Sequence, residues 1–276
     1  MANTKDIQRR IKSISSTKKI TKAMEMVAAA KMRKAVEAVL KTRTYANLSW
    51  ATVLNLSEAN GGNGQDLHPL LKKREQIKRV GIILITSNRG LCGGFNTAIM
   101  HKVKESIKKY QMLGEEVVVE AEFVLMGKKG AGIHHHNHKI VADFPKLDLA
   151  SEVSEIVPVA KLLISEYLAG TYDKVMVAYT DFVSASNQVP RVKQLLPVDI
   201  SAEEEFLGVV GGDTRLGTTK EMIEEKEEQH TQTEKYSYDY TFEPSPREVL
   251  DEMVPRLIEV QLFQALLESN ASEHSA

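Results

Sequence analysis

The residues with the clearest chemical potential form a glycine-rich turn, TSNRGLCGGFN, which follows the apolar run VGIILIT and precedes a segment with helical spacing. A strand, a glycine turn and a helix N-terminus can together hold a phosphate through backbone N–H groups. The spacing of the three glycines matches neither G-x-x-x-x-G-K-[ST] nor G-x-G-x-x-G. Two interpretations stay open: an anion site, which Arg89 slightly favours, or a structural turn in which Asn96 or Thr97 caps the helix.

Other reactive side chains give weaker signals. The run HHHNH at 134–138 contains potential metal ligands, but no carboxylate or cysteine lies at ligand spacing, so a solvated loop is favoured over a metal site. Cys92 is the only cysteine, which excludes an intrachain disulfide. Its apolar and glycine neighbours favour a buried, unreactive thiol. No Ser-His-Asp pattern or carboxylate pair stands out, so we predict no catalytic residue, no metal and no cofactor.

Charge is distributed unevenly along a chain whose formal net charge is only −1. Residues 1–43 contain twelve Lys or Arg and three Asp or Glu, whereas residues 201–235 contain ten acidic and four basic residues. The basic segment could bind nucleic acid, act as a transit peptide, or meet acidic partner surfaces. Composition alone leaves these three alternatives open. No apolar run approaches the roughly 20 residues that a membrane-spanning helix needs.

Two long helices are expected, one at each end of the chain. Residues 3–57 contain no proline or glycine, and their apolar residues recur mostly every three or four positions, so we predict a helix of roughly 80 Å that ends at NGGNG. A second stripe follows PSP at 244–246, with a bend expected at Pro255. Because neither stripe can be buried by its own helix, we expect the two to pack as an antiparallel coiled coil. The longer N-terminal helix should then need a further surface.

Between them, segments with strand and helix character alternate. Strands are expected at VGIILIT, EVVVEAEFVLM, KIVADF, DKVMVAYTDF and QVPRVKQLLPV, and helices at 97–110 and 151–168. This alternation predicts an α/β fold with a largely parallel, Rossmann-like sheet. We therefore divide the chain into an N-terminal helix (1–58), an α/β domain (77–200), an acidic insertion or mobile segment (201–243) and a C-terminal helix (244–276).

Four motifs, in order along nearly the whole chain, resemble the gamma subunit of F-type ATP synthases. They are IQRRIKSISSTKKITKAMEMVAAAKMRKA, TSNRGLCGGFN, FVSASNQVP with the following LLP, and the C-terminal segment YSYDYTFEPSPREVLDEMVPRLIEVQLFQALLESNASEHSA. The first and last are highly specific. Members of that family continue for many helical turns beyond the ASEHSA segment, which leads us to expect that this chain is incomplete or ends early.

The resemblance implies a central-stalk rotor subunit without a catalytic site of its own. Its two helices would form a shaft inside a head of alpha and beta subunits, and its α/β domain would be a foot bound to the epsilon subunit and the membrane rotor ring. The implied location is peripheral, on the cytoplasmic face of a bacterial inner membrane, with no nucleic acid bound. By motif match, Met24 would lie near an acidic loop of the beta subunit, with Lys19, Lys31 and Arg33 as neighbours. The alternative is a nucleotide- or anion-binding α/β protein that uses the turn at 86–97.

Overall fold

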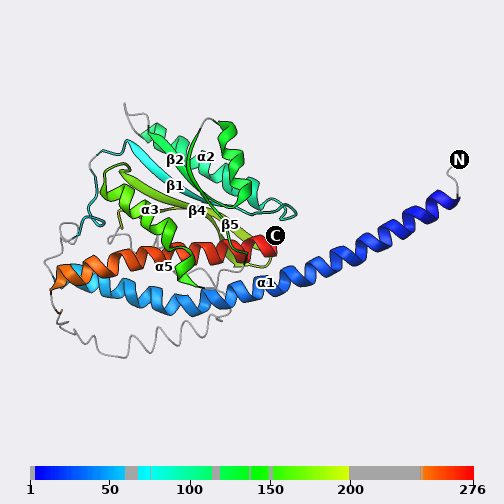
Figure 1. Ribbon diagram of the computed structural model, residues 1–276, viewed down its shortest axis with the longest axis horizontal. Helices are drawn as coiled ribbons and strands as arrows, with labels where there is room; N and C mark the ends of the chain where they lie inside the picture. Colours follow the sequence, from blue (N-terminus) through cyan, green and yellow to red (C-terminus); the bar gives the residue numbers. More distant parts are fainter. Residues whose placement is uncertain are drawn as a thin grey trace.

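The computed structural model describes residues 4–59, 68–74, 76–113, 119–136, 138–148, 152–198, 243 and 245–276. These residues form a five-stranded sheet with helices on both faces, and a pair of long helices that runs along one side (Figure 1). The expected α/β fold with paired terminal helices is thereby confirmed. The acidic segment predicted at 201–243 falls almost entirely outside the described residues.

The paired helices are α1 (Thr4–Ala59) and α5 (Pro246–Ser275). They lie side by side and run in opposite directions (Figure 1), as the two apolar stripes predicted. The second half of the α1 stripe is used in this contact, where Val39 and Val53 are buried in the same apolar cluster as Leu257 and Leu262 of α5. Burial of both stripes against each other is the main reason for the pairing.

None of the described residues covers the first half of the α1 stripe, and α1 continues past the α/β domain as an arm (Figure 1). We call residues 4–27 the free arm, because every one of them is exposed. Its large apolar side chains are between 47% and 68% exposed; they are Ile7, Ile11, Ile14, Ile20, Met24, Met26 and Val27. An exposed row of this length on a soluble helix indicates an interaction surface.

Helix α5 begins with a well-formed cap. The Ser245 hydroxyl oxygen accepts a hydrogen bond from the backbone N–H of Glu248 and donates one to its carboxylate, and Pro246 occupies the first turn. These features satisfy a donor that the helix start would otherwise leave free. Pro255 lies within α5, which continues through it as one helix to Ser275. From 257 to 272 every residue of α5 is buried.

The strands are β1 (Arg79–Ile85), β2 (Glu120–Met126), β3 (Lys139–Phe144), β4 (Lys174–Ser184) and β5 (Asn187–Leu196). They lie in the order β3-β2-β1-β4-β5, and every neighbouring pair is parallel except the antiparallel β4–β5 hairpin. Pro190 lies in β5, an edge strand, where its missing N–H does not interrupt a second ladder.

Helices cover both faces of this sheet. Helix α2 (Phe95–Leu113) packs on one face, over an apolar cluster that includes Ile82 and Phe123. Helix α3 (Val157–Leu168), α5 and part of α1 cover the other face. The helix expected at 151–168 is shorter than predicted: a 3₁₀ turn, η3 (Val153–Glu155), precedes α3, whose first turn contains Pro158. Within the described ranges, no helix is both long and apolar enough to cross a membrane.

The turn GKKGAG after β2 forms a second 3₁₀ helix, η2 (Lys128–His136). Gly127 precedes it with a φ of 105°, a conformation that side-chain-bearing residues rarely adopt. The Thr86 hydroxyl at the end of β1 donates a 2.9 Å hydrogen bond to the Gly127 carbonyl. This contact joins the carboxyl ends of β1 and β2, next to the glycine turn at 86–97.

Candidate functional site

The glycine turn at the end of β1 is held by its own polar side chains. The Ser87 hydroxyl donates to the Arg89 carbonyl at 2.6 Å. The Asn96 amide oxygen accepts from the Ser87 N–H at 3.0 Å, and its nitrogen donates to the Ser87 hydroxyl at 2.7 Å. Asn96 therefore ties the turn back to the strand instead of capping α2 as one interpretation expected. The first backbone bond of the helix is made from Ala98 to the Gly94 carbonyl.

Cys92 is buried in this turn, as expected, and its sulfur lies 3.2 Å from the Asn96 amide nitrogen and 3.6 Å from the Ser87 hydroxyl. Leu91 has a φ of 67° and is 88% exposed. Arg89 is exposed on the same turn. The turn is thus a self-bonded connection with an apolar residue at its tip, which is poor chemistry for holding a phosphate.

The space in which doubly wound sheets bind ligands, outside the carboxyl ends of the strands, is occupied by the chain itself. A Cβ added at Gly93 would lie 3.5 Å from the backbone oxygen of Ala276. Lys146, which follows β3, lies over the Phe95 ring at 5.6 Å and is paired with Glu273 of α5. This filling argues against the alternative of a nucleotide site at 86–97.

A polar cluster at the same end of the sheet connects the α/β domain to both long helices. The Lys146 ammonium, with none of its side chain exposed, donates a 2.5 Å hydrogen bond to the Glu273 carboxylate. Burial lowers the pKa of Lys146 below its ordinary value, although Glu273 acts in the opposite direction. Unpaired burial of either charge would be costly, so the two side chains hold each other in place.

Asp148, two residues later, is partly exposed and meets α1. Lys31 donates to its carboxylate at 3.2 Å, with the two side chains 29% and 32% exposed. Burial raises the pKa of Asp148, but hydrogen bonds from Lys31 and Asn88 outweigh this effect, and the pKa lies below its ordinary value. The nearby His274 of α5 has its pKa lowered by burial. These charges stabilise a contact, and none is poised beside an open cleft for catalysis.

The four residues expected to meet a partner lie on α1 in two different environments. Lys19 and Met24 are on the free arm, and Met24 is 47% exposed. Arg33 is also exposed, and its Nε donates only to the carbonyl of Ala29, one turn earlier in α1. Lys31 differs, because its charge is already paired with the foot. A shallow hollow on the free arm is lined by Gln8, Ile11, Lys12, Ser15, Ser16 and Lys19.

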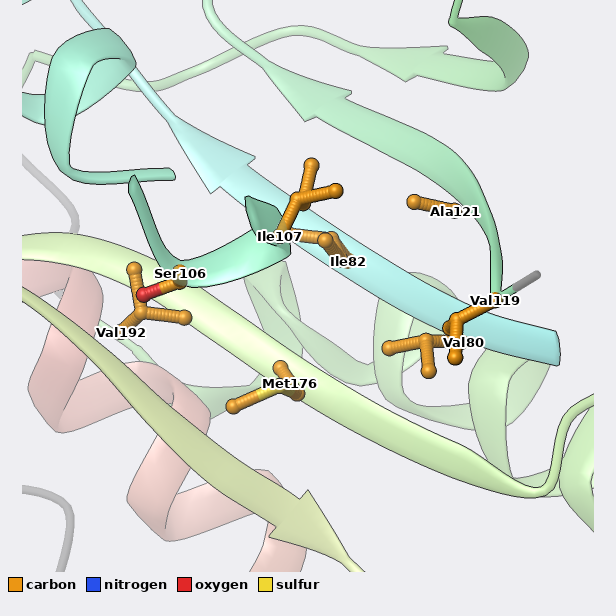
Figure 2. Close-up of a pocket in the computed structure, with 8 residues that line it drawn as sticks. All are labelled: Val80, Ile82, Ser106, Ile107, Val119, Ala121, Met176 and Val192. Atoms are coloured by element: carbon orange, nitrogen blue, oxygen red, sulfur yellow. The ribbon is translucent and has the colours of Figure 1, made fainter. Parts of the chain in front are cut away.

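A small pocket lies between α2 and the sheet (Figure 2). Its lining consists of seven apolar side chains and one serine: Val80, Ile82, Ser106, Ile107, Val119, Ala121, Met176 and Val192. It belongs to the apolar interior beneath α2 and has no ionisable group in its wall. Such a lining can bury a methyl group, and its one polar side chain, Ser106, has no acid or base beside it in the wall to activate its hydroxyl.

Metal binding finds no support in the described part of the chain, where no three His, Cys, Asp or Glu side chains gather closely enough to hold an ion. The backbone of residues 134–136 forms the end of η2 instead of the expected loop. The side chains of these histidines lie outside the described residues.

Comparisons with known proteins agree with the resemblance in the motifs. A family model described as ATP synthase matches residues 3–276. The ATP synthase gamma chains of Azoarcus sp. (strain BH72) and Legionella pneumophila (strain Corby) are 35% and 34% identical to this chain, over all of it and 84% of their own length. Among solved structures, the central stalk and c-ring of the Tetrahymena thermophila mitochondrial ATP synthase contains a similar chain, with a TM-score of 0.60 and 21% identity over 93% of this chain and 95% of that one. The last likeness is one of fold.

Proposed function

The chain belongs to the ATP synthase gamma chain family, and on that premise we propose that it turns as the central-stalk rotor of an F-type ATP synthase. In this role it couples proton-driven rotation of a membrane ring to ATP synthesis in a head of alpha and beta subunits. The chain itself carries no catalytic site and transmits motion between sites on other subunits. The family match over 3–276 is the observation that carries this proposal.

The geometry supports a shaft anchored on a foot. Helix α1 has 56 residues, about 84 Å at 1.5 Å per residue, and only its second half is packed against the α/β domain and α5. The free arm then projects as a helix whose apolar stripe and basic groups need another surface (Figure 1). The head of alpha and beta subunits supplies that surface.

Within the arm, Lys19 and Met24 are the proposed contacts with the head, with Arg33 nearer the foot. Exposed pairs between basic side chains and acidic loops are each worth roughly 0–1 kcal/mol, weak enough to be made and broken as the shaft turns. Lys31 belongs to the same proposed set of contacts with the head, although its ammonium group already forms an ion pair with Asp148 of this chain.

The α/β domain is the proposed foot, bound to the epsilon subunit and the rotor ring. The bacterial relatives support a location on the cytoplasmic face of an inner membrane, where the chain is held peripherally by these partners.

The proposal is tested in vesicles that contain the assembled synthase with or without this chain. With an imposed proton gradient, we expect ATP synthesis only when the chain is present. Lys19→Glu should reduce synthesis, because it reverses a charge on the free arm, whereas the matched variant Lys108→Glu on the exposed side of α2 should not. Equal synthesis with and without the chain would refute the rotor role.

A further inference from the structure

We propose that a hollow at the amino ends of β1 and β4 binds a carboxylate side chain of the membrane rotor ring. The hollow has a volume of about 200 Å³, and its wall contains three basic side chains, Lys73, Arg74 and Lys174, and one acidic side chain, Asp173. The excess of positive charge attracts an anion. This preference stands on the residues of the wall, whereas the identity of the partner rests on the proposed rotor function.

Arg74 is fixed in the wall before a partner binds. Its Nη2 donates a 2.9 Å hydrogen bond to the carbonyl of Tyr167 in α3, and its guanidinium carbon lies 5.2 Å from the centre of the Tyr167 ring. The Tyr167 hydroxyl donates a 3.0 Å hydrogen bond to the carbonyl of Lys72. The Arg74 side chain is still 36% exposed, so a planar donor group with five N–H bonds is held at the surface in a fixed orientation, which suits both oxygens of a carboxylate.

Asp173 does not cancel the positive charge of the wall. Its Oδ2 accepts hydrogen bonds from the backbone N–H groups of Lys78 and Arg79, at 2.9 Å and 3.0 Å. Its Oδ1 lies 3.8 Å from the Arg74 Nη1. The single acidic group is thus bonded to the start of β1 and helps to place Arg74, and the basic groups remain in excess.

An apolar part of the wall favours a carboxylate on a short carbon stem. Ile77 and Pro197 line the hollow together with the basic groups. The Gln194 amide nitrogen donates a 2.6 Å hydrogen bond to the carbonyl of Pro197 and holds the end of β5 at this wall. An Asp or Glu side chain has methylene groups to place against these residues, whereas a phosphate has none. The volume is also below the roughly 300–1,000 Å³ typical of pockets for small-molecule ligands, which argues against a nucleotide.

The position of the hollow selects the rotor ring as the partner. Helix α1 passes the α/β domain toward its N-terminus at Asp148, which follows β3 and so lies at the carboxyl ends of the strands. The hollow lies at their amino ends. Strand β4 spans ten residue steps, so the two ends of the sheet are about 30 Å apart. In the proposed rotor, α1 runs from the foot to the head, so the amino ends of the strands face the other way, toward the ring (Figure 1).

Binding of the 276-residue chain to vesicles that carry the ring and the epsilon subunit tests the hollow. We expect Arg74→Glu to raise the Kd about tenfold or more, because it reverses the charge that meets the carboxylate. Arg74→Lys keeps the charge but loses the planar donor group, so its Kd should lie between the two. Lys72→Glu is the matched control, since Lys72 is exposed in the same segment but is not part of the wall, and its Kd should be unchanged. Circular dichroism confirms that each variant is folded.

A carbodiimide cross-link identifies the group that enters the hollow. The reagent takes up the water that is lost when an ammonium group and a carboxylate in contact form an amide. We expect mass spectrometry to find Lys73 or Lys174 joined to an Asp or Glu of the ring. The double variant K73R/K174R keeps both charges, so it should bind as the native chain does and lose this cross-link.

Equal Kd values for Arg74→Glu and Lys72→Glu, or no cross-link to these two lysines in the native complex, would overturn the carboxylate site. A cross-link to the epsilon subunit would overturn the assignment to the ring. Binding to vesicles of the same lipids without protein, if it depended on Arg74, would show that the hollow takes a lipid headgroup and would overturn the proposal. Failure of the native chain itself to bind the ring vesicles would instead contradict the rotor function on which the choice of partner rests.

Discussion

Replacement of Gly127 by alanine should destabilise the α/β domain by about 2–4 kcal/mol. At its φ of 105° an added Cβ would lie 2.3 Å from the carbonyl oxygen of Thr86 and 2.8 Å from the carbonyl carbon. A side chain in such a backbone conformation costs about 1–3 kcal/mol. Moving the Thr86 backbone aside also weakens the hydrogen bond from its hydroxyl to the Gly127 carbonyl, worth about 1 kcal/mol.

The measurement is thermal and urea-induced unfolding of the 276-residue chain. At about 2–4 °C per kcal/mol for a chain of this size, the Tm should fall by about 10 °C. Gly90→Ala is the control, because an added Cβ there meets no atom within 4 Å, and its effect should stay within about 0.5 kcal/mol. If Gly127→Ala unfolds at the same temperature as Gly90→Ala, the argument from backbone geometry is refuted.

Further changes test other parts of the fold. Ser245→Ala should cost about 1 kcal/mol in urea unfolding, because it removes the α5 cap. Lys146→Ala should cost about 3–5 kcal/mol by leaving Glu273, whose side chain is only 12% exposed, without its partner, whereas the double variant K146M/E273M should be much closer to the native stability. Burial lowers the pKa of His68, so the unfolded state binds the proton first and stability should fall as pH drops below about 6.5; His68→Gln should have a shallower slope between about pH 7.5 and 5.5. Titration calorimetry of the 276-residue chain with ATP or ADP should show no saturable binding, since the chain itself fills the space beside the glycine turn.

Periodicity predicted the long elements because their burial is one-sided. The α1 stripe from Met32 to Val39 meets α5, and its spacing alone placed it on one face. The same spacing in residues 4–27 predicted a helix. It could not show that the apolar side chains of this helix are exposed, since covered and uncovered apolar stripes have the same spacing. The parallel strands were recognisable as apolar runs, because both faces of the sheet are covered by helices.

The polar contacts were not predictable in the same way. Lys146 lies in FPKLD, a sequence typical of an exposed loop, and its partner Glu273 is 127 residues away. Asn96 occupies a position where a residue that caps a helix is common. Its side chain instead bonds to the backbone N–H and the hydroxyl of Ser87, which come within reach only after β1 and α2 have packed. Side-chain bonding of this kind follows from tertiary neighbours, and a local pattern contains no information about them.

Helix α5 shows why the burial of a helix cannot always be predicted from the spacing of its apolar residues. Between 257 and 272 it is buried on every side, although this stretch includes Gln261, Glu268 and Asn270. An amphipathic helix buries one face, but α5 lies against α1, against β4 and beside α3 at the same time. A helix surrounded in this way has no solvent face left for polar residues. Some of them find partners in the α/β domain, as the Asn270 amide nitrogen does with the carbonyl of Leu147 and the Ser272 hydroxyl with the carbonyl of Thr180, whereas the buried Ser269 hydroxyl has no hydrogen-bond partner among the described residues. The mixed pattern of α5 is therefore typical of a helix that is packed on three sides, and two of its buried polar residues, Asn270 and Ser272, mark points where it is bonded to the α/β domain.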